Sequence, residues 1–77
     1  MPRFYFDVVE NGKAATDETG LDVDGLETAE RQVAIAVAET MPNSATFWGQ
    51  TVTVVIRDET RQPLARVMVT LNRERLS

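Results

Sequence analysis

Residues 24–41 read DGLETAERQVAIAVAETM, and this stretch decides the fold because it carries the periodicity of a helix. Its apolar residues recur every three or four positions, so they share one face of a helix with about 3.6 residues per turn. Asp24 is expected to cap the helix, with Glu27 completing a capping box and Gly25 in the first helical position. Pro42 ends it, because the residue before a proline avoids the helical conformation. The apolar face consists of Leu26, Ala29, Val33, Ala36, Val37 and Met41.

Ile35 is the one large apolar residue outside this face. At about 100° per residue it lies opposite Leu26, with Ala34 and Ala38 beside it. A single exposed apolar residue is ordinary on a protein surface. The alternative is that Ile35 packs against a second copy of the chain.

Strands are predicted on both sides of the helix, where apolar and polar residues alternate. Asn11-Gly12 predicts a tight hairpin between the first two strands. Residues 21–23 are expected to lead into the helix in an extended conformation. The whole chain, residues 1–77, is expected to form a single α+β domain in two layers, with one helix on a mainly antiparallel sheet of three to four strands. The strands are predicted at residues 3–9, 13–16, 51–58 and 64–72, which gives the order β-β-α-β-β.

The composition argues against catalysis and against cofactors. The chain has no cysteine and no histidine, so it offers no thiolate, no imidazole base and no Cys/His metal site. Half of its twelve acidic residues lie between Asp17 and Glu30. A calcium loop with Gly25 in its sixth position would nevertheless put Gly20 and Arg31 where carboxylates are required. We expect no catalytic residue, no metal site and no cofactor.

The charge distribution bears on the class of partner. The net charge is −4, which argues against binding nucleic acid. The acidic residues concentrate in residues 1–40 and the arginines in residues 41–77, so the two halves attract each other within one molecule or between neighbours. No apolar run is long enough to span a membrane or to serve as a signal peptide, which predicts a cytoplasmic protein.

Self-association is expected for a chain of this size. A domain of 77 residues buries only about 60–65% of its unfolded surface, and this one has no disulfide to add stability. The sheet face turned away from the helix carries apolar residues among its polar ones. A homodimer is therefore predicted, with either this sheet face or the outer side of the helix as the contact. The candidate interface residues are Tyr5, Ile35, Trp48 and Met68.

Four stretches resemble a family of small uncharacterised bacterial proteins that is common in alphaproteobacteria and classed as a domain of unknown function. They are Met1-Pro2-Arg3-Phe4-Tyr5-Phe6-Asp7, Asp17-Glu18-Thr19-Gly20, Asp24-Gly25-Leu26-Glu27-Thr28-Ala29 and Val54-Val55-Ile56-Arg57-Asp58-Glu59. The family usually has a glycine near the last hairpin turn, where Arg61 or Gln62 stands here, so a looser or longer turn is expected. The resemblance implies the fold and no activity.

The layout of strand, short hairpin, acidic turn and helix is also similar to that of HicB-type antitoxins, which bind a small toxin partner. Two functional hypotheses follow. The first is a small non-catalytic binding or adaptor module that self-associates. The second is an antitoxin-like regulator that binds a small basic protein through its acidic first half. The sequence names no ligand for either.

Overall fold

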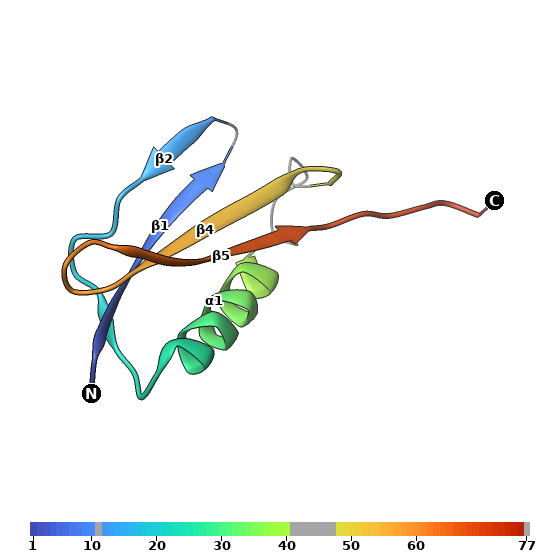
Figure 1. Cartoon of the computed structure of the whole chain (residues 1–77). Helices are drawn as coiled ribbons and strands as arrows, with labels where there is room; N and C mark the ends of the chain where they lie inside the picture. The colour runs from blue at the N-terminus through green and yellow to red at the C-terminus, as the bar shows by residue number, and fades with distance from the viewer. Residues whose placement is uncertain (11, 41–47, 77) are drawn as a thin grey trace.

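A computed structural model describes residues 1–10, 12–40 and 48–76 of the chain. It confirms the α+β class: one helix packs on one face of an antiparallel sheet, and the segment after the last strand extends away from it (Figure 1). Met41 and Pro42, which the sequence placed at the end of the helix, lie outside the described residues. The elements are β1 (Arg3–Glu10), β2 (Lys13–Ala15), β3 (Leu21–Asp22), α1 (Leu26–Thr40), β4 (Thr51–Arg57) and β5 (Pro63–Thr70).

The sheet has five strands, one more than the upper limit that the sequence predicted. Its order is β2-β1-β4-β5, and β3 pairs with the beginning of β1. The additional strand is the segment expected to be an extended lead into the helix, in which Leu21 and Asp22 pair with Phe4 and Arg3. A strand of two residues has too few positions to show an alternating pattern, so the sequence could not reveal this pairing.

The helix begins one residue later than predicted. The carbonyl of Gly25 accepts the first helical hydrogen bond, from the Ala29 N–H at 3.1 Å, so Gly25 and not Asp24 is the cap residue. Glycine is tolerated there because the cap residue lies outside the helical conformation. The predicted capping box of Asp24 and Glu27 is therefore wrong.

The core lies between α1 and the middle of the sheet. Val54 and Ile56 of β4 are the largest fully buried side chains, and Ala29 and Val33 of the helix pack against them together with Phe4. Burying a side chain such as Ile56 contributes roughly 1.5–3 kcal/mol. The alternation predicted for β4 is confirmed, since each second residue is buried.

Residues 58–62 connect β4 and β5 and form a turn held by backbone hydrogen bonds, while the expectation of a looser or longer turn than the family's stays a prediction. The Arg61 N–H donates to the Asp58 carbonyl and the Asp58 N–H to the Gln62 carbonyl, both at 3.0 Å. The Asp58 carboxylate also accepts the Thr60 and Gln62 N–H groups at 2.8 and 3.0 Å. Arg61 has φ 66°, the left-handed conformation that favours glycine. The turn thus forms without a glycine, although its left-handed conformation at Arg61 has a free-energy cost for arginine.

Two substitutions of Arg61 distinguish the cost of its left-handed backbone conformation from the contribution of its side-chain contacts. Arg61→Ala and Arg61→Gly both remove the side chain, but only glycine also relieves the left-handed strain. We expect the glycine variant to have the higher free energy of unfolding by about 1 kcal/mol. Urea denaturation of both variants measures this difference. Equal stabilities would show that the conformation at Arg61 carries no cost.

Candidate functional site

A buried carboxylate on the face of the sheet turned away from α1 anchors a polar network. Asp7 is only 7% exposed, although it lies between Phe6 and Val8 and points away from the helix. The Nε of Arg57, on the neighbouring strand β4, donates to its carboxylate. The Asp17 N–H donates to the other carboxylate oxygen at 3.1 Å. An acidic residue of the first half of the chain is thus paired with a basic residue of the second half within one molecule.

Asp17 organises the turn that follows β2. Its carboxylate accepts the N–H groups of Thr19 at 3.0 Å and of Gly20 and Phe6 at 3.1 Å. Burial disfavours the ionised form, but these donors outweigh it and hold the pKa of Asp17 below its usual value. Gly20 has φ 77°, and a Cβ there would lie 3.0 Å from the Phe4 carbonyl, so the turn requires a glycine.

Arg3 and Arg61 connect the network to the ends of the strands. Arg3 forms an ion pair with Asp22 at 2.9 Å, and its backbone N–H donates to Glu59 at 3.2 Å. Arg61 donates to the Asp17 carbonyl at 2.9 Å. Three of the four stretches on which the sequence resemblance rests therefore meet at one end of the sheet. The polar groups of this end bond to one another, so the network stabilises the fold.

No metal centre is visible in the described part of the chain. Among residues 1–10, 12–40 and 48–76, no group of three or more acidic side chains is arranged to hold an ion. Within the same ranges, no helix is long and apolar enough to cross a membrane.

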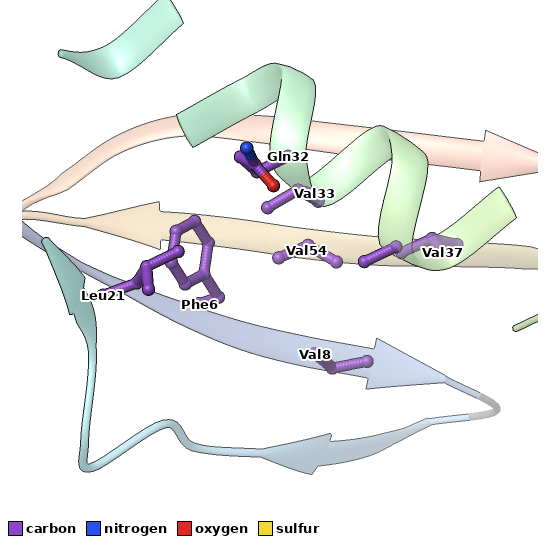
Figure 2. Close-up of a pocket in the computed structure, with 8 residues that line it drawn as sticks. Phe6, Val8, Leu21, Gln32, Val33, Val37 and Val54 are labelled. Atoms are coloured by element: carbon purple, nitrogen blue, oxygen red, sulfur yellow. The ribbon is translucent and has the colours of Figure 1, made fainter. Parts of the chain in front are cut away.

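An apolar groove of about 280 Å³ lies on the other face of the sheet, between α1 and β1 (Figure 2). It exists because α1 lies mainly along β5 and β4 and leaves the inner side of β1 and β2 uncovered (Figure 1). Gln32 is the only polar side chain among the described residues that line it. A second hollow along β2 continues it past Val8 to Glu10 and Lys13. The apolar lining residues are Phe6, Val8, Leu21, Val33, Ala36, Val37 and Val54.

The four interface residues predicted from the sequence do not form one surface. Met68 is 63% exposed and pairs with Thr53, which places it on the sheet face opposite the helix. Ile35 is 48% exposed and belongs to the helix that covers the other face. Tyr5 and Trp48 are half-buried. Arg61 lies 4.2 Å above the Tyr5 ring and Arg73 lies 4.7 Å above the Trp48 ring.

Analysis of the sequence missed the groove. Phe6 and Val8 lie on the helix-facing side of β1, but an alternating pattern does not show whether a helix covers them. The available signal was the number of strands. A sheet four strands wide spans about 19 Å, whereas one helix covers about 10 Å.

Removing the Asp7 carboxylate should destabilise the fold. Asp7→Ala leaves the guanidinium of Arg57 and the Asp17 N–H without their partner at a site that is largely shielded from water. About 2–3 kcal/mol of the free energy of unfolding should be lost, less than for a fully buried pair because Arg57 keeps about a third of its side chain exposed. Urea denaturation measures the loss. Glu18→Ala, at an exposed position, is the matched control and should change stability by less than about 0.5 kcal/mol.

Acid should weaken the turn through Asp17. Its pKa in the folded state is lowered, so its contribution is complete above the unfolded value of about 3.9 and is lost as the pH falls through the folded value. Asp17→Asn removes this titration. The variant should therefore lose less of its free energy of unfolding than the wild type when the pH falls from about 5 to 2. Urea denaturation at each pH measures this loss. The range from pH 5 to pH 2 brackets a carboxyl pKa of about 4. Parallel pH profiles would contradict the assignment. Asp58, whose pKa is lowered by the Thr60 hydroxyl and the Gln62 N–H, retains its own dependence in both proteins.

The sequence of the chain matches a known protein family. No curated protein and no solved structure matches the chain. The sequence profile of one family, "Domain of unknown function (DUF6894)", matches residues 3–70, which run from the start of β1 to the end of β5. The expectation of a family without an assigned activity is thereby confirmed, while the alphaproteobacterial distribution and the likeness to HicB-type antitoxins stay predictions. The chain belongs to the DUF6894 family.

Proposed function

We propose that this protein is a small non-catalytic binding module that works as a homodimer. The observation that carries the proposal is the apolar groove between α1 and β1, where no described element covers part of the inner sheet face. Apolar surface of this kind is stabilised when a partner removes it from water, by roughly 25 cal/mol for each Å² buried.

The size of the chain supports a second copy as the partner. The core of buried side chains is small and contains six hydrophobic residues in the described part of the chain. A domain of this length has a thin margin of stability, which association increases without further chain. A two-fold dimer also closes on itself, because each copy offers the same surface to the other.

The antitoxin-like alternative has less support in the structure. It requires the acidic first half of the chain to attract a basic protein. Asp7 and Asp22 are instead paired with Arg57 and Arg3, and Asp17 accepts three backbone N–H groups. Three carboxylates of the acidic half are thus engaged within the fold. A bacterial source and a cytoplasmic location stay predictions from the sequence.

Sedimentation equilibrium tests the proposed dimer. At micromolar concentrations the wild-type protein should have twice the chain mass of 8.6 kDa. The chain should shift to the single mass on dilution, because a two-state dimer follows mass action. A mass of 8.6 kDa at high micromolar concentration would end the proposal.

A further inference from the structure

Among residues 1–10, 12–40 and 48–76, two apolar features are left without cover, and they complement each other. One is the groove, which is concave and lined by apolar side chains apart from Gln32. The other is Ile35, a convex apolar side chain about 200° around the helix from the buried Val33, so it points away from the sheet. Each chain has one of each, so a pair of chains can satisfy both sites at once.

We propose that α1 of each copy lies over the uncovered part of the other copy's sheet and inserts Ile35 into the other copy's groove. This inference rests on the proposed homodimer and specifies its contact. The two helices then form one middle layer between two sheets. Each helix has its inner side on its own β4 and β5 and its outer side on β1 of the second copy.

The width of the layers favours this arrangement. Four strands span about 19 Å and a helix about 10 Å, so the sheet has room for two helices side by side. Its own helix lies mainly along β4 and β5, and no other described element covers the remaining half, which includes the groove (Figures 1 and 2). A helix from a second copy has the width that this half requires.

The symmetry places Ile35 level with the groove. In this arrangement a two-fold axis parallel to the helices relates the two copies. Each residue of one helix therefore lies at the same height along that axis as the same residue of the other helix. The helical residues that line the groove are Gln32, Val33, Ala36 and Val37. The middle of this set falls between positions 34 and 35. Ile35 of the second copy therefore arrives at the centre of the groove.

The surroundings of both sites suit the contact. Ala34 and Ala38 beside Ile35 are small and exposed, which lets the second sheet approach the helix closely. Arg31 is one helical turn before Ile35, on the same side of the helix, and its exposed ion pair with Glu27 at 3.8 Å would border the inserted side chain. Lys13, in the hollow that continues the groove, lies toward the end where the second helix terminates. Its ammonium would meet the negative end of that helix dipole.

The other exposed apolar side chains fit a two-fold contact less well. Leu64 and Met68 lie on the opposite face of the sheet, so a dimer formed through them would leave both the groove and Ile35 in water. Insertion of Met68 into the groove of the next copy would join two different surfaces and could continue into a chain of molecules. The reciprocal Ile35 contact closes after two copies.

Matched charge substitutions test the contact. Ile35→Glu would desolvate a carboxylate in an apolar groove, so the dimer dissociation constant should rise by about 100-fold or more in sedimentation equilibrium. Met68→Glu, at a more exposed apolar residue, should leave the dissociation constant unchanged. Circular dichroism checks that both variants are folded, which is expected because both positions are on the surface. A folded Ile35→Glu variant with the wild-type dissociation constant would overturn the inference.

Cysteine pairing gives a second test that does not depend on weakening the dimer. The chain has no cysteine, so each introduced thiol is unique. Ile35→Cys and Val8→Cys, made in separate chains and mixed, should form a mixed disulfide under mild oxidation, because a side chain in the groove contacts its floor. Chains that carry only Ile35→Cys should form no disulfide with each other, since the two side chains at position 35 point toward opposite sheets. Ile35→Cys mixed with Met68→Cys is the matched control and should not cross-link.

The outcomes separate the contact from the dimer itself. A wild-type monomer overturns the proposed function and this inference together. A wild-type dimer that is insensitive to Ile35→Glu, and whose Ile35→Cys and Val8→Cys chains form no mixed disulfide, keeps the proposed function and overturns only the contact. A monomer whose groove resonances shift when an apolar small molecule is added would assign the groove to a different occupant and likewise overturn the inference.

Discussion

One helix has to cover a sheet that is too wide for it. A helix spans about 10 Å, and four strands at their usual spacing span about 19 Å. The helix lies over β4 and β5, where it buries Val54 and Ile56, and the inner side of β1 is left partly open. The position of the core and the existence of the groove both follow from this mismatch in width.

The other face of the sheet has no helix and is held by charges. Asp7 and Arg57 join the two central strands, and Asp17 fixes the turn that crosses beside them. A buried ion pair adds little net stability, because desolvation offsets most of its attraction, but its loss leaves an unpaired charge. The network therefore specifies which strands are neighbours and where the turns lie, while the apolar face supplies most of the stabilisation.

The sequence predicted those parts of the structure that depend on local periodicity. The helix, the long strands and the buried face of β4 follow from spacings of about 3.6 and 2 residues, and the structure confirms them. The cap at Gly25 and the two-residue strand β3 were missed because each depends on one or two backbone hydrogen bonds. The pairing of Asp7 with Arg57 was missed because fifty positions separate them and only the strand order brings them together.

The candidate site was predicted in part, for a related reason. Ile35 stands out in a helical projection as an apolar residue on the wrong side, so its exposure could be predicted from α1 alone. The groove could not, because it is the absence of cover over Phe6 and Val8 and depends on where the helix lies across the sheet. A pattern along one element shows which side chains face inward, but only tertiary packing decides whether anything lies above them.

A dimer that uses the groove would leave the outer sheet face for other partners. With Ile35 inserted in the second copy, Met68 and Leu64 remain exposed on the surfaces that face away from the two helices. Arg66, on the same strand and face, adds a positive charge to this surface. An adaptor role would then have a physical basis in two separate surfaces. The inner face would hold the copies together, and the outer face, presented twice by the two-fold symmetry, would offer a partner the avidity of two linked sites.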